Sequence, residues 1–228
     1  MANKEQKKRE ETLRLSEVDT YVFDYGGVVS FHYCEPWQSN ISHLLQVDPK
    51  IADELLSETS PQGKAYRQGK ITRDEFWQEV IQLAGSNSVS ANELEDNWAR
   101  SYQIDQRMLN MIARLRNERG FKVGVMMNTD AYRHHHIEQE YQLPSKVDFI
   151  ISSFQTGVTK PDPEAYRLAL IAADRIEMPG KVIYIDDKLK NIAPCLPLGM
   201  KSYAFKSYED LRGRLQNEAV INFKGKNI

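Results

Sequence analysis

The sequence predicts an α/β fold in which a parallel sheet carries a helical insert. Short runs that are apolar almost throughout recur along the chain, polar or acidic residues follow several of them, and helical patterns fill the segments between. Continuously apolar strands are typical of parallel sheets that are covered by helices on both faces. Ligands of such sheets bind outside the carboxyl ends of the strands, so the residues that follow each run are the candidate site.

The composition favours a globular protein with a small-molecule partner. The 228 residues are 41% hydrophobic and 27% charged, which excludes a disordered or fibrous chain. Thirty Lys and Arg residues nearly balance 32 Asp and Glu residues, so a net charge of −2 argues against nucleic acid or a membrane as partner. The cysteines Cys34 and Cys195 are too few for a disulfide framework and indicate a cytoplasmic protein. The oligomeric state is left open.

Five apolar runs are the candidate strands of the sheet. Asp24 ends the first run, Asn128 follows the second, and the pair Asp186 and Asp187 ends the fourth. Lys160 lies beyond the third run, between a glycine loop and a helix. Because parallel strands end at one edge of a sheet, we expect these residues to converge. The runs span residues 21–23, 123–127, 149–151, 182–185 and 202–205.

A long segment between the first two runs has no strand pattern and is longer than a crossover requires. Its apolar residues recur at helical spacing, and the pairs Thr72 with Glu75 and Ser90 with Glu93 match the capping box of a helix start. We therefore predict a small helical bundle. The predicted organisation is a flexible leader at 1–19, a core formed by 20–31 and 104–228, and a helical insert at 32–103.

Two helices of the core have recognisable ends. One begins after Asp105 and ends at Gly120, a residue that suits the left-handed conformation at a helix terminus. The other has Asp162 as its cap and Pro163 in its first turn, where the missing N–H is harmless.

An aspartate at a strand end, followed by glycines, suits a carboxylate nucleophile that attacks a phosphoryl group. A cation must offset the repulsion between carboxylate and phosphate, and Mg²⁺ is held by carboxylates together with substrate oxygens. Asp186 and Asp187 supply such carboxylates, and Lys160 supplies a fixed positive charge for the phosphoryl oxygens. The residues therefore favour phosphoryl chemistry.

In order and spacing, four segments resemble the motifs of the haloacid dehalogenase superfamily: residues 23–29, 127–129, 160–163 and 185–191. The resemblance implies a Rossmann-like core with an inserted helical cap. It is nearest to the branch that contains sugar-phosphate phosphatases and the amino-terminal phosphatase domain of soluble epoxide hydrolase. It implies a Mg²⁺-dependent phosphatase that hydrolyses a small phosphorylated metabolite, such as a sugar phosphate, through an aspartyl-phosphate.

The resemblance also implies a role for each matching residue. Asp24 is the nucleophile and a metal ligand, and Gly26 contributes its carbonyl to the metal and curls the backbone around the phosphate. Asp187 binds the metal directly, while Asp186 and Asn191 lie next to it.

Two further residues are implied as phosphate contacts. Lys160 binds both the nucleophile and the phosphate, and the backbone N–H of Asn128 binds the phosphate.

Two positions depart from the family pattern. Gly26 stands where most of these phosphatases have an aspartate that protonates the leaving group, and such a loss costs about 10²–10⁴ in rate. Met127 replaces a Ser or Thr hydroxyl, and the loss of one such donor costs about 3–4 kcal/mol. His32 is a candidate substitute acid, although a solvent-exposed hinge histidine is the simpler interpretation.

These departures leave an alternative open: a catalytically impaired relative that binds a phospho-ligand or a protein partner. The dehalogenase branch is disfavoured by resemblance, because its tyrosine lies two residues after the nucleophile, whereas Tyr25 follows Asp24 directly.

Overall fold

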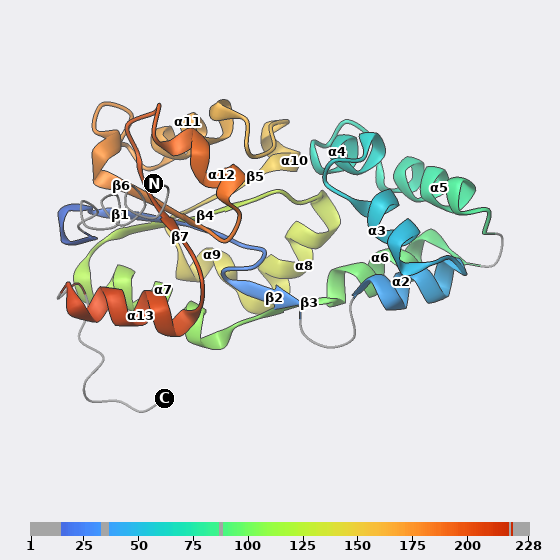
Figure 1. The fold of residues 1–228 in the computed structure, drawn as a ribbon, viewed down its shortest axis with the longest axis horizontal. Helices are drawn as coiled ribbons and strands as arrows, with labels where there is room; N and C mark the ends of the chain where they lie inside the picture. Colours follow the sequence, from blue (N-terminus) through green and yellow to red (C-terminus); the bar gives the residue numbers. More distant parts are fainter. Residues whose placement is uncertain (1–14, 33–36, 87–88, 219, 221–228) are drawn as a thin grey trace, which may run out of the picture.

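The structure of the protein is a computed structural model in which residues 15–32, 37–86, 89–218 and 220 are described. A sheet with helices on both faces forms one body, and helices α2 to α6 form a second body at one end of it (Figure 1). No helix among these residues is long and apolar enough to cross a bilayer.

The central sheet of the described chain has five strands in the order β5-β4-β1-β6-β7. Every neighbouring pair is parallel, which confirms the predicted α/β class. β1 lies in the middle, so Asp24 at its end is flanked by the ends of β4 and β6. The strands are β1 (Thr20–Asp24), β4 (Lys122–Met127), β5 (Phe149–Ser152), β6 (Val182–Asp186) and β7 (Lys201–Ala204).

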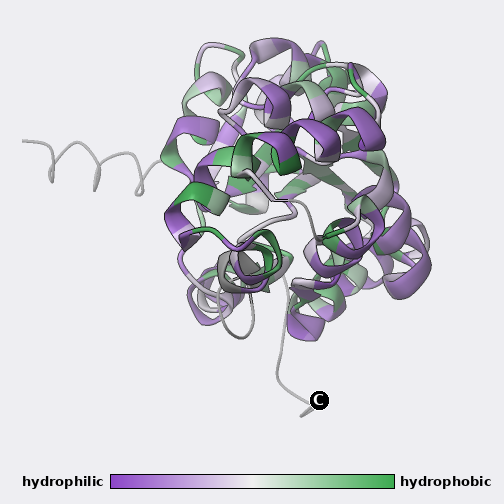
Figure 2. Cartoon of the chain, turned by 90° about the vertical axis from the view of Figure 1, so that its right-hand side faces the viewer, coloured by the Kyte–Doolittle hydropathy of each residue, from purple (hydrophilic) through white to green (hydrophobic). Residues whose placement is uncertain are grey.

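Each face of the sheet has its own apolar core because neighbouring strand residues point to opposite sides. Tyr21 and Phe23 pack into one core, and Val22 between them packs into the other. The first core is closed by α7 (Gln106–Arg119), α8 (Ala131–Tyr141), α9 (Leu143–Lys146) and α13 (Tyr208–Asn217). The second is closed by α11 (Pro163–Ala172) together with η3 (Ala193–Cys195). Hydrophilic residues cover much of the outer helix surface (Figure 2).

The predicted helix ends are confirmed. Asp105 caps α7 by accepting from the backbone N–H of Arg107, and Gly120 ends that helix with φ 68°. Asp162 caps α11, with proline in its first turn. The shorter elements are η1 (Leu15–Glu17), α10 (Ser153–Thr156), η2 (Pro179–Lys181) and α12 (Leu189–Ile192).

The core begins before residue 20, where the sequence placed its boundary. Leu15 is 0% exposed and Val18 is 3% exposed, and both pack into the first core. Leu15 also accepts a hydrogen bond through its carbonyl from the hydroxyl of Tyr21. Residues 15–19 are therefore anchored, while residues 1–14 of the predicted leader lie outside the described residues.

The five helices between β2 and β3 have an apolar core of their own, which includes Trp77 and Trp98. Thr72 and Glu75 form the complete capping box of α5, whereas Ser90 caps α6 without the reciprocal bond from Glu93. We call this body the cap. Its helices are α2 (Trp37–Leu45), α3 (Pro49–Leu56), α4 (Pro61–Arg67), α5 (Arg73–Ala84) and α6 (Ala91–Arg100).

The expectation of a strand-free insert is wrong at its two ends. β2 (Ser30–His32) and β3 (Tyr102–Ile104) pair antiparallel where the chain leaves the core and returns to it. Each strand has only three residues, too few for an alternating pattern to be visible in the sequence. The pair forms because the cap needs two adjacent connections at one point of the core.

Candidate active site

The residues that follow the strands line one pocket. It has a volume of about 350 Å³ and lies between the carboxyl edge of the sheet and the cap. Asp24, Asn128, Lys160 and Asp187 reach it from the core side, as the parallel topology requires. Asp186 lies directly behind them, fully buried at the end of β6.

Lys160 is held against Asp24 by a complete set of acceptors. Its ammonium group forms an ion pair with the Asp24 carboxylate and donates to the carbonyl of Met126 at 3.0 Å and to the hydroxyl of Tyr184 at 2.9 Å. Lys160 and Asp24 are each 5% exposed. Since an ammonium has three protons, all are engaged and the cation is fixed in place.

Asp24 lies in a buried and acidic environment, in which a nearby positive charge stabilises its ionised form. The pKa of Asp24 is raised to about 7, first by burial and also by the carboxylates of Asp186 and Asp187, while the Lys160 ammonium opposes the rise. One oxygen from each of the three aspartates lies within 4.8 Å of the others. Such a set of oxygen ligands fits a hard divalent cation, which would relieve the repulsion between them.

Asp186 and Asp187 have different surroundings. Asp186 accepts from the hydroxyl of Tyr184, from the backbone N–H of Lys188 at 2.8 Å and from the side-chain amide of Asn191 at 3.0 Å. Asp187 is exposed and lines the pocket. Asp187 therefore has more free oxygen capacity for a metal, while Asp186 is held by donors.

The two glycines after Asp24 have different constraints. Gly27 has φ +94°, and a Cβ there would lie 2.6 Å from an oxygen of Asp187. Only glycine allows this close approach without strain. Gly26 lines the pocket, and a Cβ there would meet no atom within 4 Å. The predicted contact of its carbonyl with a metal or phosphate stays a prediction.

The side chain of Asn128 clamps the backbone of Lys160. Its oxygen accepts from the Lys160 N–H at 2.8 Å, and its amide donates to the Lys160 carbonyl at 3.0 Å. These two hydrogen bonds fix the backbone at Lys160. Met127 lines the pocket beside Asn128. Its side chain has no hydroxyl, so this position lacks the Ser or Thr donor of the family motif.

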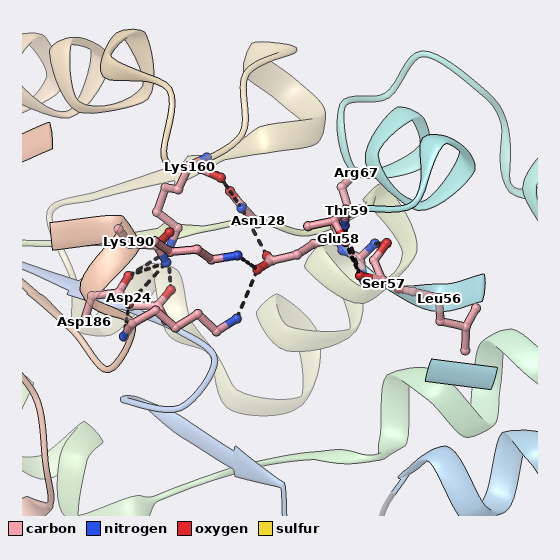
Figure 3. A network of polar contacts seen from close by, with 12 residues as sticks. Asp24, Leu56, Ser57, Glu58, Thr59, Arg67, Asn128, Lys160, Asp186 and Lys190 are labelled. Atoms are coloured by element: carbon pink, nitrogen blue, oxygen red, sulfur yellow. Dashed lines mark hydrogen bonds and ion pairs between the residues drawn. The ribbon is translucent and has the colours of Figure 1, made fainter. Parts of the chain in front are cut away.

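The cap places one carboxylate over the site. Glu58, in the loop between α3 and α4, accepts from Lys190 at 2.8 Å, from Lys188 at 3.2 Å and from Asn128 at 3.4 Å. Figure 3 shows Glu58 reaching from the cap toward Lys190 and Asn128. Burial by itself would raise the pKa of Glu58, yet the two lysines lower it to about 2. The carboxylate is therefore ionised and joins cap to core.

Two guanidinium groups also line the pocket, that of Arg67 from the cap helix α4 and that of Arg133 from the core helix α8. Arg67 donates to the backbone carbonyls of Leu56 at 2.8 Å and Gly63 at 2.9 Å. The Arg133 guanidinium carbon lies 3.9 Å from the ring centre of Trp98, and that of Arg67 lies 5.1 Å from it. Both guanidinium groups lie against the Trp98 ring, and that of Arg133 is also ion-paired with the buried carboxylate of Asp130.

Sequence reasoning missed Glu58, Tyr184 and Lys188. Tyr184 could have been found, because residues two apart on a strand share one side and Asp186 is two residues later. No sequence pattern marks Glu58 as a site residue, because its hydrogen-bond partners lie far from it in the sequence.

Among the side chains that the structure describes, no histidine lines the pocket. His134 contacts Ser152 at 2.7 Å and Glu138 at 3.1 Å, while its neighbour His135 is exposed and bonds to the carbonyl of Ala131. The backbone of His32 belongs to β2, but its side chain lies outside the described residues, so its role as a substitute acid stays a prediction.

Comparisons with known proteins agree with this geometry. The family model of haloacid dehalogenase-like hydrolases matches residues 18–197. The sesquiterpene phosphatase astK of Aspergillus oryzae is 28% identical over 183 residues, which cover 78% of this chain and 85% of that protein. The bifunctional epoxide hydrolase 2 of Sus scrofa is 24% identical over 78% of this chain, which spans 35% of that protein.

Solved structures show the same fold. A HAD family enzyme from Bacteroides thetaiotaomicron, in complex with magnesium and inorganic phosphate, has a TM-score of 0.71 at 20% identity. That likeness covers 85% of this chain and 98% of the other. The L-2-haloacid dehalogenase from Xanthobacter autotrophicus has a TM-score of 0.59 at 17% identity, covering 87% of this chain and 82% of that one. With the family model matched from β1 to beyond β6, the chain belongs to the haloacid dehalogenase-like hydrolases.

Proposed function

We propose that the protein is a Mg²⁺-dependent phosphatase that hydrolyses a small phosphorylated metabolite. The observation that carries this proposal is the placement of Asp24 between the Lys160 ammonium and the cluster of acidic oxygens, at the floor of a pocket closed by the cap. Phosphatases among the relatives, and a neighbour that holds magnesium and phosphate, support the same chemistry.

Asp24 acts as the nucleophile. One of its carboxylate oxygens attacks phosphorus, the bond from phosphorus to the leaving oxygen breaks, and an aspartyl-phosphate forms while the alcohol leaves as its anion and then takes a proton from water. Water then attacks the phosphorus and restores the Asp24 carboxylate and inorganic phosphate. A Mg²⁺ ion held by Asp24 and Asp187 would offset the negative charge of the phosphoryl oxygens. Lys160 holds the nucleophile in position through both steps.

The identity of the leaving group follows from the missing acid. Gly26 has no proton donor, so the reaction favours alcohols that leave as stable anions, such as an anomeric hydroxyl. The pocket of about 350 Å³ suits a small molecule, and the many polar and charged residues of its lining favour a polar one. A sugar phosphate has these properties.

Phosphate release tests the proposal. Wild type and Asp24→Asn are assayed with sugar phosphates, nucleotides and an aryl phosphate, with and without Mg²⁺. Activity that requires both the metal and Asp24 supports it, and trapping a phosphorylated Asp24 by mass spectrometry supports the intermediate. The asparagine variant keeps the size of the side chain, and circular dichroism checks its folding because the buried Lys160 loses a charged partner.

A second candidate function follows from Gly26 and Met127. A chain without the acid and the hydroxyl donor suits a protein that binds a phospho-ligand or a protein partner without turnover. Activity no higher than that of Asp24→Asn on every substrate, with thermal stabilisation by the same compounds, would favour this candidate.

A further inference from the structure

Three residues on the core side of the pocket have no free side-chain donor for a phosphoryl group. Met127 has none, and the Asn128 amide is engaged by the Lys160 carbonyl and Glu58. The three protons of Lys160 are taken by Asp24, Met126 and Tyr184. A phosphate dianion bound beside these three residues would therefore be stabilised by a further cation from the surrounding residues.

Lys188 lies where such a cation is needed. It lines the pocket together with Asp24 and Asn128, and its ammonium interacts electrostatically with Asp24 and Asp187. Its backbone is fixed, because its N–H donates to Asp186 at 2.8 Å. Its side chain is 46% exposed, so the ammonium can change partner while the backbone stays in place.

The present partner of Lys188 comes from the cap. Its ammonium lies 3.2 Å from Glu58 Oε1. Lys190 donates to the same oxygen at 2.8 Å. Glu58 therefore stays neutralised by Lys190 when Lys188 moves to another anion, so releasing Lys188 leaves no isolated buried charge. Figure 3 shows the Lys190 contact.

We propose that Lys188 is a catalytic residue that turns from Glu58 to the phosphoryl oxygens of the substrate and replaces the donor that Met127 lacks. This inference rests on the proposed phosphatase function. It assigns different tasks to two neighbouring lysines. Lys188 binds the phosphoryl group, and Lys190 keeps Glu58 neutralised and the cap in place.

Lys190 is a matched control within the same chain. It has the same carboxylate partner and a similar exposure, 49% against 46% for the side chains. The two lysines differ in their position relative to the pocket: Lys188 is among the residues that line it, whereas Lys190 is not. If both lysines only join the cap to the core, their removal should have equal effects.

The experiment compares Lys188→Met, Lys188→Arg and Lys190→Met with wild type in Mg²⁺. Hydrolysis of p-nitrophenyl phosphate reports on turnover, and calorimetry with inorganic phosphate reports on binding without turnover. We expect Lys188→Met to lower kcat/KM about 10²–10³-fold, the usual cost of one lost oxyanion donor, and to raise the Kd of phosphate at least about tenfold. Lys188→Arg, which keeps the charge, recovers part of both.

The result for Lys190→Met decides between the two roles. Without Lys190, Glu58 competes with phosphate for Lys188, and because a half-exposed ion pair is weak we expect changes of no more than about fivefold. Equal effects of Lys188→Met and Lys190→Met on phosphate binding would overturn the proposal, and so would a wild type that binds no phosphate. A wild type that binds phosphate through Lys188 but hydrolyses no ester would overturn the phosphatase function alone.

Discussion

The hydroxyl oxygen of Tyr184 lies 2.9 Å from Lys160 Nζ and accepts a hydrogen bond from it. Its own proton goes to Asp186, which lies two residues later on the same strand. Tyr184 and Asp186 are fully buried. One neutral group thus links the cation that holds Asp24 to the carboxylate of Asp186.

Replacement of Tyr184 by Phe should weaken both activity and stability. The substitution leaves Lys160 with an unused proton and Asp186 with one donor fewer, while the ring is kept. Hydrogen bonds to charged groups contribute about 1.5–3 kcal/mol. We expect the free energy of unfolding in urea to fall by about that amount and kcat/KM for p-nitrophenyl phosphate to fall about tenfold or more.

Tyr21→Phe serves as the control for this substitution. Tyr21 is also buried, and its hydroxyl donates to the Leu15 carbonyl at 3.0 Å, at the opposite end of the same strand from Asp24. Its removal should cost about 0.5–1.5 kcal/mol of stability and leave kcat/KM unchanged. If Tyr184→Phe behaved in the same way, the link between Lys160 and Asp186 would have no role in catalysis.

Gly27→Ala should reduce the affinity for Mg²⁺. The new methyl group would lie 2.6 Å from one oxygen of Asp187 and the backbone has φ +94°, so the carboxylate or the loop has to move. We expect the Kd for Mg²⁺, measured by calorimetry, to rise about tenfold, equivalent to about 1.4 kcal/mol. Gly213→Ala, where a Cβ meets no atom within 4 Å, should leave it unchanged. An unchanged affinity in Gly27→Ala would argue against Asp187 as a ligand.

Binding of Mg²⁺ should release protons near neutral pH. The pKa of Asp24 is raised from 3.8 to about 7 by burial and by its acidic neighbours. At pH 6 the metal-free site therefore holds a proton that the metal displaces. We expect the affinity for Mg²⁺ to increase between pH 6 and pH 8. Calorimetry in buffers with different ionisation enthalpies counts the protons, and Asp24→Asn should abolish their release.

The same shift predicts how the metal-free protein responds to pH. The folded state binds the Asp24 proton more tightly than the unfolded chain does, so its contribution to the free energy of unfolding decreases as pH rises from about 4 to about 7. Saturating Mg²⁺ should remove this decrease. A wild type whose pH dependence matches that of Asp24→Asn would contradict the raised pKa.

Glu58→Gln should loosen the contact between cap and core. The lysines hold the pKa of Glu58 at about 2, so the ion pair should persist from pH 5 to pH 8 and weaken only as pH falls from about 4.5 toward 2. Half-exposed pairs contribute about 0.2–1 kcal/mol each. We expect amide hydrogen exchange in α4 to become about twofold to fivefold faster at pH 7. Glu54→Gln, an exposed residue of α3, should show no change.

The strands and the nucleophile were predictable from local pattern. Buried parallel strands are apolar along their whole length, so β1, β4 and β6 are visible as runs, and the polar residue that ends each run marks the edge of the sheet. β2 and β3 were not predictable, because three residues carry no period and their pairing depends on where the cap joins the core.

The sequence by itself determined which chemical groups meet at the carboxyl edge of the sheet, because parallel topology brings the ends of β1, β4 and β6 together whatever the details of packing. Only the tertiary structure decided how those groups are partnered. Glu58 meets Lys188 across 130 positions of the chain, and Lys160 meets Asp24 across 136. Such contacts depend on how the cap packs against the core and on which acceptor lies within reach of each buried donor. No local sequence pattern contains that information.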